Sequence, residues 1–207
     1  MAPTVLITGF GPFPGVPVNP TETLVERLVK AARRRGIRCV GHVFATRYGT
    51  VDRELPALLA RHRPDVLLMF GLAARRQHVC IEMYARNRMS TRAPDAGGFL
   101  PHAAAIAPDA PARLRGRAPF ARLLAATHLA RVKTRLSSDA GSYLCNYLYW
   151  QALDRAAKPG GPRVAVFVHV PEVRLPRRSA GRRTLFTIDR LVRAATAVLS
   201  VVVTAGR

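Results

Sequence analysis

The sequence has 207 residues, of which 49% are hydrophobic, and its formal net charge is +21 at pH 7. This length and apolar content suffice for a buried core, which excludes a disordered or fibrous protein and predicts one domain over residues 1–207. The three cysteines, Cys39, Cys80 and Cys145, are odd in number and form no CxxC pair. Their spacing indicates neither a zinc site nor a disulfide framework, and it fits a reduced, cytoplasmic setting.

The excess of positive charge is typical of proteins that bind polyanions. Most of it is arginine spread along the chain, and no aromatic residues interleave with it in the pattern of an RNA-binding surface. The runs are Arg33–Arg35, Arg75–Arg76, Arg177–Arg178 and Arg182–Arg183. Solvated arginine faces explain the charge equally well, so nucleic-acid binding is the second hypothesis. Residues 1–4 lack the features of a signal peptide and the apolar stretch 194–205 is too short for a bilayer, so we expect no membrane association.

Short apolar runs alternate with helical patterns along the chain. Strands are predicted at 4–9, 37–45, 65–70, 79–87, 132–136 and 164–168, with a short irregular strand within 99–106 and a loop over 108–119. Helices are predicted from Asn19 to Gly36 and at 51–61, 120–129, 142–156 and 184–203. This alternation predicts an α/β/α sandwich, in which helices flank a twisted, mostly parallel sheet. Functional sites of such sheets gather at the carboxyl ends of the strands, so the loops after Ile7 and Phe70 should lie close together.

Cys145 lies in the opening turn of a predicted helix, directly after a turn of small residues, Ser138–Ser142. A thiol at this place is close to unpaired backbone N–H groups and to the positive end of the helix dipole, which favour the thiolate. The thiolate is the nucleophilic form of cysteine. The alternative is a buried cysteine that packs as a small hydrophobic residue.

Two further residues complete the set that a cysteine hydrolase needs. His169 ends the apolar strand 164–168, and Glu82 lies in the otherwise apolar strand 79–87. A carboxylate in such a strand is either exposed at a sheet edge or has a buried partner. A thiolate attacks, an imidazole pairs with it and protonates the leaving amine, and a third group orients the imidazole. The spacing alone does not establish that the three residues meet.

Several motifs follow one another along nearly the whole chain. They are Thr8–Phe13, Asn19–Thr21, Gly71–Ala73, Ile81–Asn87, Arg92–Asp95, Ser138–Asn146 and Phe167–Pro171. In content and interval these segments resemble the signature segments of the pyroglutamyl peptidases, a family of cysteine peptidases also called pyrrolidone-carboxylate peptidases. Because many separate motifs match in order, the resemblance is specific.

The resemblance implies that Cys145 is the nucleophile, His169 the acid and base, and Glu82 the group that orients His169. Arg92 falls where the family has an arginine near the reacting carbonyl, a place suited to stabilising an oxyanion. The residues implied to bind the substrate ring are Phe10, Phe13, Asn19, Leu72, Tyr143 and Leu144. A flat, uncharged lactam suits aromatic walls, whereas a charged peptide N-terminus would be costly to bury there. Phe10 and Phe13 have the alternative of anchoring their loop in the core.

We therefore expect a cysteine exopeptidase that removes N-terminal pyroglutamate from peptides. No ligand cluster or phosphate-binding loop is evident, so we expect neither a metal nor an organic cofactor, and the resemblance implies a homo-oligomer, often a tetramer. Two departures bear on substrate preference. Ala74 and Arg75 stand where the family usually has two glycines, and Arg88–Thr91 carries no carboxylate where relatives tend to be acidic. The alternative is a relative of the same fold with altered specificity or lost activity, which binds polyanions through its arginines.

Overall fold

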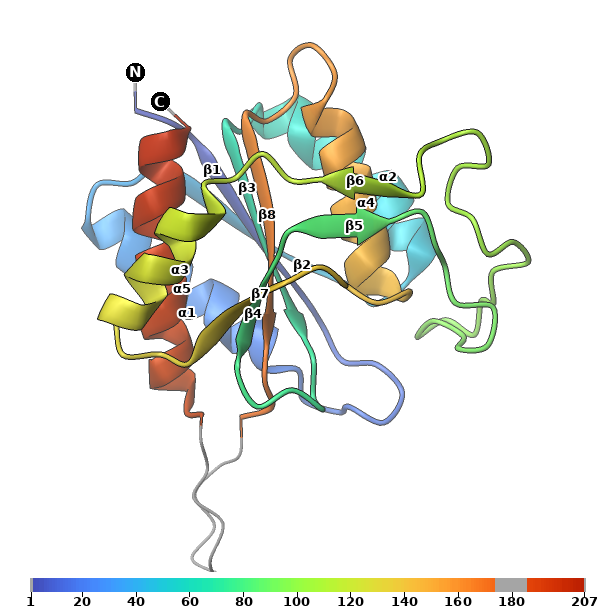
Figure 1. The fold of residues 1–207 in the computed structure, drawn as a ribbon, viewed down its shortest axis with the longest axis horizontal. Coiled ribbons are helices and arrows are strands. Elements are labelled where there is room, and N and C mark those ends of the chain that lie inside the picture. The colour runs from blue at the N-terminus through green and yellow to red at the C-terminus, as the bar shows by residue number, and fades with distance from the viewer. Residues whose placement is uncertain (1, 174–185, 207) are drawn as a thin grey trace, which may run out of the picture.

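Six strands form one mixed sheet at the centre of the molecule (Figure 1). The computed structural model describes residues 2–173 and 186–206. The strand order is β2-β1-β3-β8-β4-β7. The strands are β1 (Val5–Phe10), β2 (Cys39–Phe44), β3 (Val66–Leu72), β4 (Val79–Glu82), β7 (Thr134–Ser137) and β8 (Val164–Val170). All neighbours pair in parallel except β4 and β8, which are antiparallel.

Helices cover both faces of this sheet (Figure 1). One layer holds α1 (Pro20–Arg34), α3 (Phe120–Leu129) and α5 (Ile188–Ala205), and the opposite layer holds α2 (Tyr48–His62) and α4 (Leu144–Ala156). The prediction of an α/β/α sandwich with a mostly parallel sheet is thus confirmed. None of the helices in the described parts of the chain combines the length and apolar composition that a membrane span requires.

The central strands separate two apolar cores. Ile7 and Leu68 pack with α1 and α5, whereas Leu6, Leu67 and Met69 pack with α2 and α4. Successive side chains of a strand point to opposite faces, so strands buried on both sides read as continuous apolar runs. Burial of each large apolar side chain contributes about 1.5–3 kcal/mol. Because β1 and β3 are neighbours, the loops after them lie at the same edge, as predicted.

The segment predicted as one strand over 79–87 forms two strands. The chain leaves the sheet at Met83, whose N–H donates to Ser137 and whose carbonyl accepts from Gly116. It continues as β5 (Tyr84–Arg86), which pairs with β6 (Arg113–Arg115) in a separate two-stranded ribbon. The predicted loop over 108–119 therefore contains a strand. No strand forms within 99–106, where the irregular one was predicted, so that prediction was wrong.

The ends of several other elements differ from the predicted ones by a few residues. Helix α4 begins at Leu144 with Tyr143 as its N-cap, two residues after the predicted start. Asn19 caps α1 as predicted, because its side chain accepts from the N–H of Thr21. The predicted start of the last helix at Thr184 lies outside the described residues, as do Arg177–Arg178 and Arg182–Arg183.

Candidate active site

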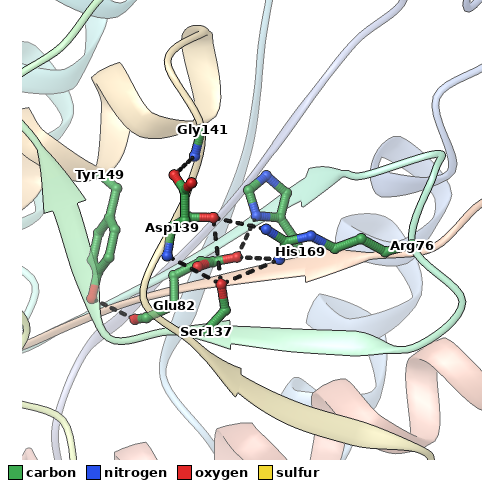
Figure 2. Close-up of polar contacts among 7 residues, drawn as sticks. All are labelled: Arg76, Glu82, Ser137, Asp139, Gly141, Tyr149 and His169. Atoms are coloured by element: carbon green, nitrogen blue, oxygen red, sulfur yellow. Dashed lines mark hydrogen bonds and ion pairs between the residues drawn. The ribbon is translucent and has the colours of Figure 1, made fainter.

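Glu82 and His169 meet across the antiparallel pair of strands β4 and β8. In the register of these two strands, Cys80 lies opposite His169, and Glu82 lies opposite Phe167. The Glu82 and His169 side chains therefore lie on one face of the sheet, and His169 Nδ1 is 2.8 Å from Glu82 Oε1 (Figure 2). Glu82 is 0% exposed and His169 5%. Of the two alternatives for this carboxylate, the structure therefore has the buried partner and not the exposed edge.

Cys145, the second residue of α4, lies above the neighbouring strand β3. A methyl group added at Gly71 would lie 2.6 Å from Cys145 Sγ and 2.7 Å from the Phe167 ring. Gly71 and His169 are register partners in β3 and β8, and neighbouring strands are about 4.8 Å apart. The structure thus gathers the sulfur, the imidazole and the carboxylate in one place. Among the described residues, no hydrogen bond joins the sulfur to the imidazole.

Burial dominates the acidity of the Cys145 thiol in the free protein. Burial raises the pKa of Cys145 from 9.0 to about 12, and the Glu82 carboxylate adds to that rise. The thiol's own backbone N–H and the Arg76 guanidinium lower this pKa without overcoming burial. The sequence-based expectation of a thiolate held by the helix N-terminus was therefore wrong for the resting state.

Arg76 is a part of the site that the sequence prediction missed. It lies between β3 and β4, where its Nη1 donates to Glu82 Oε1 at 2.6 Å and its Nη2 to the Asp139 carbonyl at 2.7 Å (Figure 2). The prediction treated Arg75–Arg76 as surface charge. The signal that could have revealed Arg76 was the carboxylate itself, because a buried Glu82 needs a cation and Arg76 is six residues away.

Two residues of α4 hold its first turns against the neighbouring segments. The Asn146 amide is fully buried; it accepts from the Arg86 N–H and donates to the carbonyls of Arg86 and Arg88. The Tyr149 hydroxyl donates to the Glu82 carbonyl at 2.9 Å (Figure 2). The helix that carries Cys145 is therefore tied to both strands that flank Met83.

Two of the predicted ring-binding residues lie together, and one of them, Tyr143, is two residues before Cys145. Phe13 and Tyr143 are both half-buried, with ring centroids 6.4 Å apart. The Tyr143 hydroxyl donates to the Pro94 carbonyl, and the ring of Tyr48 lies 6.2 Å away at right angles. These rings form an aromatic wall next to the start of α4.

The other predicted site residues occupy different surroundings. Phe10 and Leu144 are buried in the core on the α2 and α4 side. Asn19 is buried, and its Nδ2 donates to the Gly11 carbonyl, so it fixes the loop that carries Phe13. Leu72 ends β3 and is partly exposed. Their part in substrate binding stays a prediction.

Arg92 lies exposed in the loop that follows β5. Its backbone N–H donates to Ser90, and among the described contacts its side chain forms no ion pair or hydrogen bond with Glu82, Cys145 or His169. Its role at the oxyanion stays a prediction. Within residues 2–173 and 186–206, no group of three or more His, Cys, Asp or Glu side chains could hold a metal ion.

Comparisons with known proteins identify the relatives of this chain. A model of the family described as pyroglutamyl peptidase matches residues 3–205. The chain is 32% identical over 169 residues to the pyrrolidone-carboxylate peptidase of Pyrococcus furiosus, which covers 82% of this chain and 81% of the relative. It is 33% identical over 179 residues to pyrrolidone-carboxylate peptidase 1 of Ralstonia nicotianae, and the match covers 86% of this chain and 82% of the relative. The crystal structure of pyroglutamyl peptidase I of Bacillus amyloliquefaciens matches with a TM-score of 0.85 at 26% identity. The match covers 98% of this chain and 97% of that protein.

Proposed function

The chain belongs to the pyroglutamyl peptidase family, and on this premise we propose that it is a cysteine exopeptidase that releases N-terminal pyroglutamate from peptides. The observation that carries the proposal is the buried pairing of His169 Nδ1 with Glu82, one strand away from the glycine that faces the Cys145 sulfur. A buried carboxylate–imidazole pair beside a thiol is the arrangement that activates a cysteine nucleophile.

The pairing defines which nitrogen of His169 does the chemistry. An ionised carboxylate only accepts hydrogen bonds, so Nδ1 carries the proton shared with Glu82 and Nε2 has a free lone pair. Nε2 takes the proton of the neutral Cys145 thiol as the sulfur attacks the pyroglutamyl carbonyl. The imidazolium returns that proton to the departing peptide amine, which leaves a thioester. Water then attacks the thioester with Nε2 as the base, releasing pyroglutamate and restoring the thiol.

The aromatic wall accounts for the proposed ring specificity. Phe13 and Tyr143 present apolar faces beside Cys145, which suit the uncharged five-membered lactam. The ammonium group of an ordinary peptide N-terminus would lose its hydration there without gaining a partner. Peptides with N-terminal pyroglutamate are thus the proposed substrates, and by analogy with the family the proposed assembly is a homo-oligomer, which light scattering would test.

A fluorogenic assay tests the proposed function directly. The protein is incubated under reducing conditions with pyroglutamyl-aminocoumarin, beside the Cys145→Ala variant and with alanyl-aminocoumarin as the control substrate. We expect release from the lactam substrate alone, and none from the variant. A folded wild-type protein that releases no coumarin would contradict the proposal, and a salt-titrated nucleic-acid binding assay would then test the polyanion alternative.

A further inference from the structure

We propose that Arg76 is a positioning residue, which keeps Glu82 charged so that His169 holds the tautomer needed for catalysis. The inference rests on the proposed function, in which Glu82 orients His169. It assigns a role to a side chain that the sequence prediction treated as surface charge and that contacts Glu82 directly.

The first step is the cost of burying Glu82. The carboxylate is 0% exposed, and a buried charge without a counter-charge costs several kcal/mol. Its Oε1 accepts from both Arg76 and His169, whereas its Oε2 has no hydrogen-bond partner in the part of the chain that the structure describes. The guanidinium of Arg76 is charged at all times, so it is the permanent counter-charge of this carboxylate.

The second step concerns the proton of His169. While Glu82 is ionised it accepts from Nδ1–H, and Nε2 is free to take the thiol proton. If Glu82 were protonated, its hydroxyl would donate to Nδ1 and the remaining ring proton would move to Nε2. That tautomer cannot accept a proton from Cys145. Arg76 therefore acts on the reaction through the charge of Glu82.

The third step concerns the second contact of the Arg76 guanidinium, which is made by Nη2. Arg76 Nη2 donates to the carbonyl of Asp139, in the turn that leads to Tyr143 and Cys145. The same aspartate accepts from the Gly141 N–H and forms an ion pair with Arg86 at 3.2 Å. Figure 2 shows the guanidinium between Glu82 and Asp139. One side chain thus links the orienting carboxylate to the turn that places the nucleophile.

Among the described residues, Arg76 is the cation in direct contact with Glu82. The other titratable groups that interact with Glu82 are those of Cys80, Cys145, Tyr149 and His169, and Arg135, the register partner of Cys80, acts on the Cys80 thiol. Cys80, Cys145 and Tyr149 all have a raised pKa because they are buried, so none supplies a charge near pH 7. Loss of Arg76 would leave His169 as the hydrogen-bond partner of Glu82 among the described side chains.

Replacement of Arg76 tests the role. In Arg76→Gln we expect kcat/KM to fall about 100- to 1000-fold, mainly through kcat, because the substrate pocket is untouched. The acid limb of its pH profile should move to higher pH by about one unit or more, since proton uptake relieves the uncompensated buried charge. Arg76→Lys keeps the positive charge but cannot contact Glu82 and the Asp139 carbonyl at the same time. Its pH profile should therefore have the acid limb of the wild type, and its kcat/KM should lie between those of the wild type and Arg76→Gln. Arg61→Gln removes an exposed arginine of α2 as a control and should change neither by more than about twofold.

Alkylation of Cys145 by iodoacetamide gives a readout that needs no peptide substrate. The guanidinium lowers the pKa of the Cys145 thiol, so Arg76→Gln should be alkylated more slowly than the wild type at pH 8. A folded Arg76→Gln protein with unchanged acid limb and unchanged alkylation rate would overturn the proposal. The proposal would also be overturned if kcat/KM of Arg76→Gln fell only in proportion to the fraction of folded protein and Arg76→Lys had no higher activity. If the wild type hydrolyses no pyroglutamyl substrate, the proposed function fails, and the tautomer of His169, read by 15N NMR in the wild type and in Arg76→Gln, still decides the role of Arg76.

Discussion

At the scale of single residues, the reactivity of Cys145 depends on a balance between burial and charge. An interaction with a helix end contributes about 0.3–2 kcal/mol. A rise of the Cys145 pKa from 9.0 to about 12 corresponds to roughly 4 kcal/mol. Burial therefore outweighs the effect of the helix start on the pKa of the thiol. In the proposed mechanism the sulfur accordingly loses its proton during attack, and His169 is needed as the proton acceptor.

The balance predicts how free Cys145 reacts with iodoacetamide. Well below its pKa, the thiolate fraction rises tenfold for each pH unit, so the alkylation rate of Cys145 should climb about tenfold per unit between pH 7 and 10. Mass spectrometry of the labelled peptide measures this rate separately from Cys39 and Cys80. An alkylation rate that became independent of pH near neutral pH would show that Cys145 is already a thiolate there, which contradicts the raised pKa.

Glu82→Gln should separate catalysis from thiol acidity. The carboxylate raises the pKa of the Cys145 thiol, so its removal should speed alkylation at pH 8. Hydrolysis should instead fall about 1000-fold or more, because glutamine does not stabilise the imidazolium or fix its tautomer. Glu54→Gln is the matched control, since Glu54 pairs with His42 at 2.9 Å on the far edge strand. Equal changes of both rates in the Glu82 variant would contradict the assigned role.

At the scale of elements, local patterns account for most of the fold and for three site residues. The apolar runs of β1, β3 and β8 are visible because these strands are buried on both faces. The break at Met83 is invisible, because alternation continues through it and the turn depends on hydrogen bonds to distant residues. The short, charged strand β6 exists only by pairing with β5. The sequence did not reveal Arg76 for a related reason, because its contacts with Glu82 and the Asp139 carbonyl form only in the folded chain.

The close approach of β3 and α4 makes Gly71 a sensitive position. A methyl group there would lie 2.6 Å from Cys145 Sγ and 2.7 Å from the ring of Phe167, closer than real contacts allow. Gly71→Ala should therefore displace the sulfur, lower kcat/KM about 100-fold and cost about 1–3 kcal/mol of stability. Kinetics and urea denaturation measure the two effects.

Gly49→Ala is the matched control for this substitution. Gly49 lies in α2 and has nothing within 4 Å of the added carbon. Alanine is the better helix former, so this variant should keep full activity and gain up to about 1 kcal/mol. If Gly71→Ala were as active as Gly49→Ala, Cys145 Sγ could not lie against Gly71 in solution as it does in the structure.

At the scale of the whole molecule, the charge of +21 is a field that any substrate meets on approach. Near the proposed site, Arg88 and Arg92 are exposed. The carboxylate of that segment, Asp95, is buried and accepts from the backbone N–H groups of Tyr48, Gly97 and Phe99. This segment therefore presents positive charge to the solvent, whereas the proposed ring pocket would take an uncharged group.

This field predicts a preference for acidic peptides. With glutamate after pyroglutamate, kcat/KM should exceed that of the corresponding lysine peptide by about tenfold at low salt, because the field draws the anionic peptide in and repels the cationic one. The ratio should approach unity by about 0.5 M NaCl, where the Debye length falls to a few ångströms. An alanine peptide serves as the neutral control, and its rate should hardly respond to salt. A tenfold preference that persisted in high salt would instead require direct contacts to the second residue, and a preference for lysine would show that the positive charge does not face the substrate.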